Sequence, residues 1–150
     1  MISRYELFSN SVACLYRNIQ KLERVEMEKY GLKGPHAQCL LSLSRYPRGL
    51  IATQLCEMCE KDKAAISRTV AELEEAGLVT RVERNGSRYR AALVLTQKGK
   101  NAAAEVSERA KLAVELAGNG LTDEDREVFY RVLTLISENL HEICRDGLNN

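Results

Sequence analysis

The stretch that decides the fold is "DKAAISRTVAELEEAGLVTRVERNGSRYRAALVLTQKG", residues 62–99. Its first part is typical of a helix that begins after an N-cap at Asp62, because an aspartate side chain accepts hydrogen bonds from the free amides of a first turn. Ile66, Val70 and Leu73 recur at spacings of four and three, and a glycine follows the last turn. This pattern predicts a helix with one buried face.

Two strand-like runs follow this helix, "LVTRVER" at 78–84 and "YRAALVL" at 89–95, with "NGS" between them. An Asn-Gly pair between runs of β-forming residues is a strong signal for a hairpin. The expected hairpin carries four arginines, Arg81, Arg84, Arg88 and Arg90. Thr96 then predicts the N-cap of an alanine-rich helix over 97–117, which "GNG" ends.

Long amphipathic helices are predicted at both ends of the chain. In the first thirty residues, apolar side chains alternate at spacings of four and three, at Phe8, Val12, Leu15, Ile19 and Leu22. A last helix begins at a capping-box-like pair, Thr122 and Asp125. It repeats the apolar pattern at Phe129, Leu133, Ile136, Leu140 and Ile143. Such stripes predict burial against each other and against a second copy of the chain.

Two short helices are expected before the quoted stretch, one opened by Pro35 and one in "ATQLCEMCEK", residues 52–61. Short helices that lead into a hairpin, with long helices on either side, indicate a mainly α fold with a small β-hairpin, the winged helix-turn-helix. We expect a single domain over 1–150, with dimerisation helices at 1–34 and 97–150 and a DNA-binding module at 35–96.

The net charge of +1 does not by itself indicate a nucleic-acid partner, but its distribution does. Residues 61–100 contain nine Lys and Arg against five Asp and Glu, whereas residues 101–150 contain five against ten. Positive charge is thus concentrated around the expected helix and hairpin. The start of the chain lacks the pattern of a signal peptide, and no apolar run exceeds five residues, so we expect a cytoplasmic protein without a membrane span.

The outward face of the helix after Asp62 carries small side chains and one reaching cation. With the apolar residues inward, this face holds Lys63, Ala64, Ala65, Ser67 and Arg68. Small residues allow a helix to approach base edges, and arginine reaches guanine or phosphate. The later acids, Glu72, Glu74 and Glu75, would be repelled by phosphates, so only the first half should enter a groove. An amphipathic surface helix without a nucleic-acid partner is the alternative.

From about residue 5 to residue 146 the chain resembles the MarR family of bacterial transcriptional regulators, most clearly in "DKAAISR", "LEEAGLVTR" and "LTQKG". The resemblance implies a homodimer joined by its terminal helices that reads pseudo-palindromic double-stranded DNA and acts as a repressor. It further implies recognition helices in major grooves, wing tips in minor grooves, and release by a small aromatic, phenolic or oxidising effector.

The sequence departs from this family at three places. In the wing, Ser87 and Tyr89 stand where the family usually has Asp and Arg, so Arg88 or Arg90 is expected to substitute. The predicted DNA-binding set is completed by Arg84, Ser87, Arg88 and Arg90. Before the recognition helix, "EK" at 60–61 replaces the usual glycine and apolar residue, and Ser9 occupies the place of the reactive cysteine in peroxide-sensing relatives.

Tyr16 and His36 fall where family members form an effector pocket, and Cys39 lies one turn after His36. The five cysteines are an odd number without a secretory signal, which indicates free thiols. Two pairs spaced three apart, His36 with Cys39 and Cys56 with Cys59, resemble zinc ligands, but neither pair has the glycine or proline of a metal-binding turn. We therefore expect neither a metal nor a cofactor.

Three other functions compete with a DNA-binding regulator. A regulator controlled by thiol oxidation would need an exposed thiolate of low pKa, with Cys14 and Cys39 as candidates. A winged helix that binds protein and never DNA is the second. An enzyme is the third, and the absence of a phosphate-binding glycine loop and of HExxH argues against it.

Overall fold

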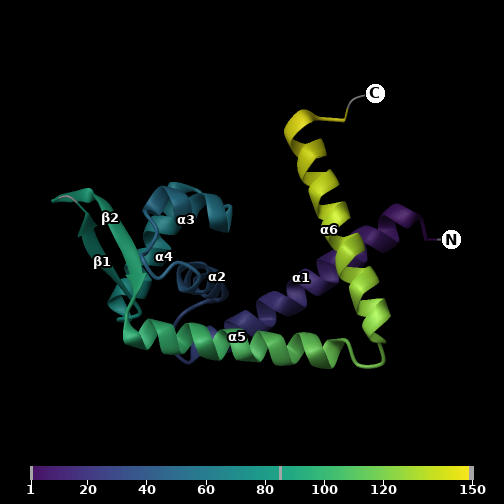
Figure 1. Cartoon of the computed structure of the whole chain (residues 1–150), viewed down its shortest axis with the longest axis horizontal. Coiled ribbons are helices and arrows are strands. Elements are labelled where there is room, and N and C mark those ends of the chain that lie inside the picture. Colours follow the sequence, from purple (N-terminus) through teal and green to yellow (C-terminus); the bar gives the residue numbers. More distant parts are fainter. Residues whose placement is uncertain (1, 85, 149–150) are drawn as a thin grey trace. The chain divides into compact units, whose positions relative to one another are not determined.

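The computed structural model of the chain describes residues 2–84 and 86–148, and the side chains at 84 and 87–90 lie outside the described part. In chain order, the helices and strands are α1 (Arg4–Glu28), α2 (Gly34–Ser44), α3 (Ala52–Cys59), α4 (Lys63–Glu75), β1 (Val79–Arg84), β2 (Ser87–Leu95), α5 (Gln97–Ala117) and α6 (Asp123–Asp146). This mainly helical chain with one two-stranded hairpin confirms the predicted fold class (Figure 1).

The chain divides into two units, residues 1–111 and residues 112–150. The first contains α1 to α4, the hairpin and most of α5, and the second contains the end of α5 and α6. Within the first unit, α2 contacts α3, α4 and β2, and α4 also contacts β1 (Figure 1). The three short helices and the hairpin therefore pack as one module.

Two helix starts follow from the caps that the sequence predicted. The Asp62 side chain accepts a hydrogen bond from the Ala65 amide over 2.7 Å, and α4 begins at the next residue. At α6, Thr122 Oγ1 accepts from the Asp125 amide over 3.1 Å, and the Asp125 carboxylate accepts from the Thr122 amide over 3.0 Å. Both caps satisfy amides that a first helical turn leaves without partners.

The core of the first unit lies between α2, α3, α4 and the hairpin, and the end of α1 and the first half of α5 also contribute to it. The predicted inward face of α4 is confirmed, because Ile66, Val70 and Leu73 are at most 2% exposed. Other fully buried members are Leu40, Leu43, Leu55, Leu78 and Leu93. Leu50, before α3, pairs with Leu93 of β2 through backbone hydrogen bonds, so the segment between α2 and α3 is fixed to the sheet.

The glycine of "LTQKG" is required by close packing. Thr96 Oγ1 accepts a hydrogen bond from the Gly99 amide over 3.0 Å, which confirms the predicted N-cap of α5. A Cβ atom on Gly99 would lie 1.9 Å from the carbonyl oxygen of Leu78. Only glycine lets the first turn of α5 approach the backbone between α4 and β1 so closely.

The hairpin pairs β1 with β2 in antiparallel register, with Val79 opposite Leu95 and Arg84 opposite Ser87. Ser87 is therefore the first residue of β2, whereas the sequence placed it in the connection. A register irregularity between Val82 and Arg84 was not predicted. It has the character of a β-bulge, which bends a strand and increases its twist.

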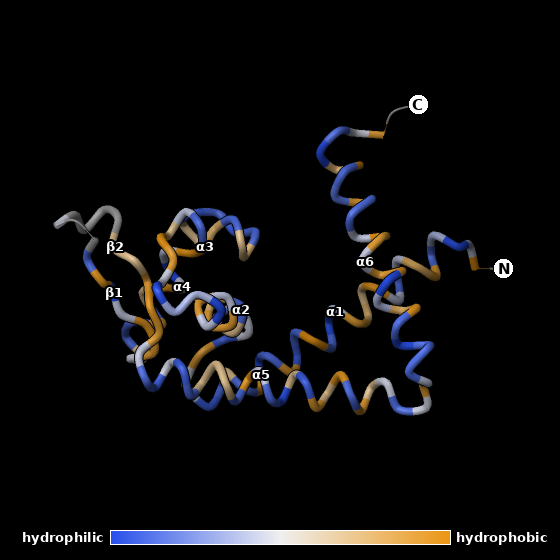
Figure 2. The backbone as a smooth tube through the Cα atoms, viewed as in Figure 1, coloured by the Kyte–Doolittle hydropathy of each residue, from blue (hydrophilic) through white to orange (hydrophobic). Residues whose placement is uncertain are grey.

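The apolar stripes of α1 and α6 are exposed within this single chain. On α1, Phe8, Leu15 and Ile19 are 42%, 56% and 50% exposed. On α6, Phe129 and Leu133 are 47% and 42% exposed, and none of its residues is buried. Apolar residues recur along both helices (Figure 2). Within the described residues, no helix is long and apolar enough to span a bilayer.

Candidate nucleic-acid interface and adjoining pocket

The first two turns of α4 expose the side chains that the sequence placed there. Lys63, Ala64, Ser67 and Arg68 are exposed, and Ala65 is half-buried beside the Asp62 cap. Two cations and two small residues thus share a face at the end of α4 where the helix dipole is positive. This face suits a polyanion, because the small side chains keep the backbone accessible and the cations attract phosphate.

The acids of the second half of α4 make bonds within the protein. Glu72 accepts from His36 Nε2 over 2.5 Å, and Glu74 accepts from Arg81 Nε of β1 over 2.7 Å. Glu75 is exposed. The acidic end of α4 therefore helps to fix this helix to α2 and to the hairpin, a role that the sequence did not indicate. The bond to Glu74 also holds the Arg81 side chain of β1 within the first unit.

The turn between α3 and α4 contains an unusual backbone conformation. Glu60 has φ of 50° and ψ of 43°, and among the described residues other than glycine it alone has a positive φ. This is the position where the resembled family commonly has glycine, which adopts the left-handed region without steric cost. The Lys61 amide donates to the Cys56 carbonyl over 3.1 Å and completes the turn.

The predicted wing residues lie at the far end of the hairpin. Arg84 and Ser87 form its last backbone pair, and Arg88 and Arg90 follow along β2. The side chains of all four lie outside the described part of the structure. Their contribution to an interface stays a prediction.

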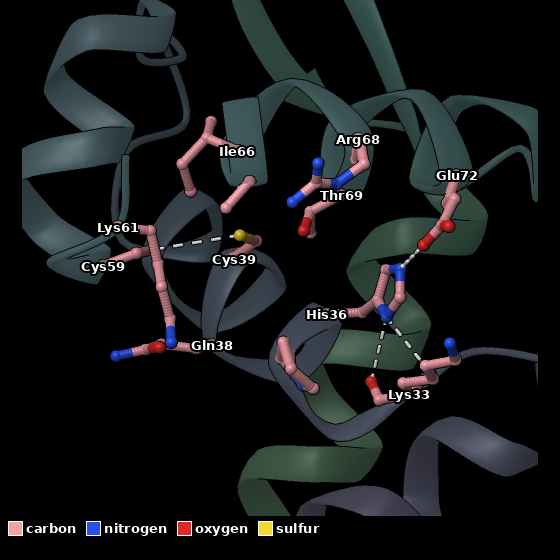
Figure 3. Close-up of a pocket in the computed structure, with 12 residues that line it drawn as sticks. Lys33, His36, Gln38, Cys39, Cys59, Lys61, Ile66, Arg68, Thr69 and Glu72 are labelled. Atoms are coloured by element: carbon pink, nitrogen blue, oxygen red, sulfur yellow. Dashed lines mark hydrogen bonds and ion pairs between the residues drawn. The ribbon is translucent and has the colours of Figure 1, made fainter. Parts of the chain in front are cut away.

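A pocket of about 250 Å³ opens between α2, the α3–α4 turn and α4 (Figure 3). It brings together the predicted pocket residues His36 and Cys39 with Arg68 of the predicted DNA-binding face. Tyr16 does not line it and is 59% exposed on α1. Sequence reasoning missed several lining residues, Lys33, Gln38, Cys59, Lys61, Thr69 and Glu72. They come from three separate elements, so no spacing along the chain could have grouped them.

His36 joins the start of α2 to the middle of α4. Its Nδ1 lies 3.0 Å from both the amide nitrogen and the carbonyl oxygen of Lys33, and its Nε2 lies 2.5 Å from Glu72 Oε2 (Figure 3). The ring is buried, with 3% of its surface exposed. His36 is therefore a structural link between α2 and α4, whatever else the pocket binds.

Two thiols meet at the inner end of this pocket. The sulfur atoms of Cys39 on α2 and Cys59 on α3 lie 3.8 Å apart (Figure 3). Ser42 Oγ lies 3.9 Å from the Cys59 sulfur. All five cysteines are free, as predicted. Among the described residues, no three metal-ligating side chains converge.

The two thiols differ in acidity. The hydrogen bond from Cys39 lowers the pKa of Cys59 to about 7 against the opposing effect of burial, and Ser42 and Lys61 also lower it. The same hydrogen bond and burial raise the pKa of Cys39 well above its usual value. Cys59 is thus the more acidic thiol of the pair.

Known proteins match both the helix-turn-helix segment and the whole fold. The MarR family model matches residues 30–88. Over this segment, which contains the predicted helix-turn-helix, the chain is similar to the MarR family. It is 22% identical to YybA of Bacillus subtilis (strain 168), an uncharacterized HTH-type transcriptional regulator, over 86% of this chain and 85% of that protein. The predicted resemblance to this family is confirmed. Its members are transcriptional regulators, not enzymes.

Solved MarR-family structures share the complete fold. A MarR transcriptional regulator from Methanosarcina mazei Go1 is 25% identical, with a TM-score of 0.81 over 92% of this chain and 99% of that one. A Listeria monocytogenes chain, described as a MarR family transcriptional regulator and solved with a 26mer DNA, is 17% identical, with a TM-score of 0.79 over 94% of this chain and 95% of that one. The likeness extends beyond the matched segment to the terminal helices.

Proposed function

We propose that this chain is a homodimeric, sequence-specific DNA-binding repressor that reads pseudo-palindromic DNA. The observation that carries the proposal is the exposed face of α4, where Lys63, Ser67 and Arg68 stand beside Ala64 at the positive end of the helix. We therefore name α4 the recognition helix. The structure of the Listeria monocytogenes relative with DNA supports the same use of this fold.

In this proposal the first half of α4 enters a major groove and the hairpin acts as a wing on the adjacent minor groove. Glu72 and Glu74, which bond to His36 and Arg81, remain outside the groove. The wing arginines, Arg88 and Arg90, hold phosphates or enter a narrow A·T-rich groove, whose negative potential attracts guanidinium groups. Specificity then comes from α4, and the wing adds affinity that depends on salt.

Dimerisation is supported by the exposed stripes of α1 and α6. Monomeric proteins rarely expose large contiguous apolar patches, and such patches mark contacts with a partner. Both stripes are amphipathic helix faces, which a two-fold related copy can cover with the same faces. A dimer would also place two recognition helices on one duplex, as pseudo-palindromic recognition requires.

Selection of bound duplexes from random-sequence DNA tests the proposal. We expect enriched sequences with approximate two-fold symmetry and half-sites about one helical turn, roughly 10 base pairs, apart. A selected duplex should bind much more tightly than its scrambled version, and a reporter promoter that overlaps the selected site should lose transcription. Failure to enrich any sequence would favour the alternative of a winged helix that binds only protein.

A small aromatic or phenolic effector is a separate proposal. The pocket that His36 and Cys39 line reaches Arg68, so an occupant there would contact the recognition helix. Its volume of about 250 Å³ is below the 300 Å³ or so at which common ligand pockets begin, which limits an effector to about one ring. Titration of the DNA complex with salicylate-sized aromatic carboxylates and phenols tests this part, with Gln38→Ala as the pocket variant, because Gln38 lines the pocket and is exposed.

A further inference from the structure

We propose that Cys39 and Cys59 form an oxidisable dithiol site, which a hydroperoxide converts into a disulfide within one chain, and that this disulfide weakens DNA binding. The effect on DNA rests on the proposed function, but the disulfide does not. The site differs from the first-helix position of peroxide-sensing relatives, which Ser9 occupies here. It joins α2 to the turn in front of the recognition helix.

The distance between the two sulfur atoms is the first support. At 3.8 Å they are already in contact, and a disulfide brings sulfur atoms to about 2.05 Å. Both side chains are almost fully buried, so they are held beside each other by the packing of α2 against α3. No second protein molecule is needed to supply a partner thiol.

Access for a small oxidant is the second support. Both cysteines line the pocket of about 250 Å³, which the exposed residues Lys61 and Arg68 also line. A water molecule occupies about 30 Å³ in the liquid, so a small hydroperoxide has room there. The cysteines are hidden from large reagents but not from one of this size.

The difference in acidity between the two thiols indicates which one reacts with the peroxide first. Cys59 is the more acidic thiol, because its contact with Cys39 and the nearby Lys61 lower its pKa, and in this proposal it reacts first, since a thiolate is the nucleophile in such reactions. Its sulfur attacks the peroxide, so an S–O bond forms, the O–O bond breaks, and the alkoxide leaves with a proton from water as the alcohol. The product at Cys59 is a sulfenic acid.

Cys39 then resolves this intermediate. Its sulfur attacks the sulfur of Cys59, the S–S bond forms, and the S–O bond breaks. The departing hydroxide takes the Cys39 proton and leaves as water. Overall, two thiols lose two electrons and two protons, and one hydroperoxide is reduced to an alcohol and water. A dithiol reductant reverses the change by thiol–disulfide exchange.

The position of Cys59 connects the disulfide to DNA binding. Cys59 ends α3, and only residues 60–62 separate it from Lys63, the first residue of α4. Cys39 lies in the middle of α2 beside Leu40, which is fully buried, whereas Glu60 and Lys61 are exposed. When the sulfur atoms close to bonding distance, the exposed turn can move more easily than α2 can. The first turn of the recognition helix would move with it.

Peptide mapping after oxidation tests the site itself. The chain with Cys14→Ser and Cys144→Ser, which removes both exposed thiols, is treated with hydrogen peroxide and then blocked with N-ethylmaleimide. Cleavage after Lys, Arg and Glu places Cys56 and Cys59 on different peptides, because Glu57 lies between them. We expect a linked pair that contains Cys39 and Cys59, in unchanged yield with the matched control Cys56→Ser. Absence of this pair, or a link between Cys56 and Cys59, would overturn the site.

DNA binding by the same samples tests the coupling. We expect oxidation to lower the affinity for a selected duplex on the order of tenfold, within the range of about 5- to 150-fold for coupled sites, and dithiothreitol to restore it. Cys39→Ala and Cys59→Ala should bind DNA but not respond to peroxide. A disulfide that forms without a change in affinity would refute the coupling. If the reduced chain binds no duplex, the proposed function fails. Peptide mapping still tests the disulfide in that case, because it uses the chain with Cys39 and Cys59 intact.

Discussion

The side-chain hydroxyl of Thr96 donates a hydrogen bond to the backbone carbonyl of Gly77, with 2.6 Å between the two oxygen atoms. Thr96 caps α5, and Gly77 lies just after the recognition helix. Lys98 adds a second bond, from Nζ to the Ala76 carbonyl over 2.9 Å. The start of α5 is therefore fixed to the end of α4, and we expect a displacement of either helix to be transmitted to the other.

The close packing at this junction predicts that Gly99→Ala destabilises the chain. The new methyl group would meet the Leu78 carbonyl oxygen at 1.9 Å, and forced overpacking costs about 1 to 3 kcal/mol or more. The better helix propensity of alanine returns only about 1 kcal/mol. Urea unfolding should show a lower free energy of unfolding for Gly99→Ala and little change for Lys100→Ala, an exposed position one residue later. Equal stability of both variants would show that the junction is loose.

The left-handed conformation of Glu60 predicts that Glu60→Gly stabilises the chain. A residue with a Cβ atom loses about 1 to 2 kcal/mol in this conformation, and the greater freedom of glycine in the unfolded chain offsets part of the gain. We expect the free energy of unfolding to rise by about 0.5 to 1 kcal/mol. The matched control is Glu57→Gly in α3, which should lower it by about 1 kcal/mol. A loss of stability in both variants would contradict the assigned strain at Glu60.

Much of the fold could be predicted because its signals are local. The cap at Asp62 and the apolar spacing after it gave the start and the buried face of α4, and "LTQKG" gave the start of α5. Each of these signals acts within about one turn of helix, where sequence spacing determines which groups meet. The hairpin was predicted for the same reason, but the irregularity after Val82 was not.

The contacts that build the pocket could not be predicted, because they join distant parts of the chain. Cys39 and Cys59 are twenty residues apart, and His36 and Glu72 are thirty-six apart. Spacing grouped Cys39 with His36 and Cys59 with Cys56, whereas the packing of α2 on α3 brings Cys39 to Cys59. For the acids of α4, the sequence likewise indicated only repulsion from phosphate. It did not indicate that Glu72 and Glu74 form bonds to α2 and β1.

The division of α4 into a groove-facing half and an outer half predicts opposite effects of two substitutions on DNA binding. Arg68→Ala should weaken binding to a selected duplex by about 1 to 3 kcal/mol, because a guanidinium can pair with guanine or clamp a phosphate. Glu75→Ala should leave the affinity unchanged or raise it slightly. Glu75 is the suitable control, because Glu72 and Glu74 also hold the fold. Fluorescence anisotropy measures both, and loss of binding only in Glu75→Ala would mean that the helix docks differently.

The exposed stripe of α6 predicts that Leu133→Arg disrupts a homodimer. A charge in an apolar interface would be buried without a partner, which is strongly unfavourable. Sedimentation velocity should show a dimer for the unsubstituted chain, monomer or aggregate for Leu133→Arg, and a dimer for Arg131→Ala, which lies off the stripe. Loss of residues 122–150 should have a more severe effect, aggregation or unfolding, because the proposed dimer would lose one of the two helices whose stripes form its interface. A folded, monodisperse monomer after that deletion would refute the proposed architecture.

The acidity of Cys59 predicts a thiol titration well below that of an ordinary cysteine. The hydrogen bond from Cys39 is the largest cause of its lowered pKa of about 7, Ser42 and Lys61 act in the same direction, and burial opposes them. Cys59 should therefore be protonated below about pH 7 and thiolate above it, whereas a free cysteine changes near pH 8.5. The ultraviolet absorbance of the thiolate, taken as the difference between the chain and Cys59→Ala, reports this change without a reagent entering the pocket. Cys39→Ala removes the contact that lowers the pKa of Cys59 most, so the pH midpoint of the Cys59 titration should rise. A midpoint near pH 8.5 in the unsubstituted chain would show that Cys59 is not the thiolate of the pair.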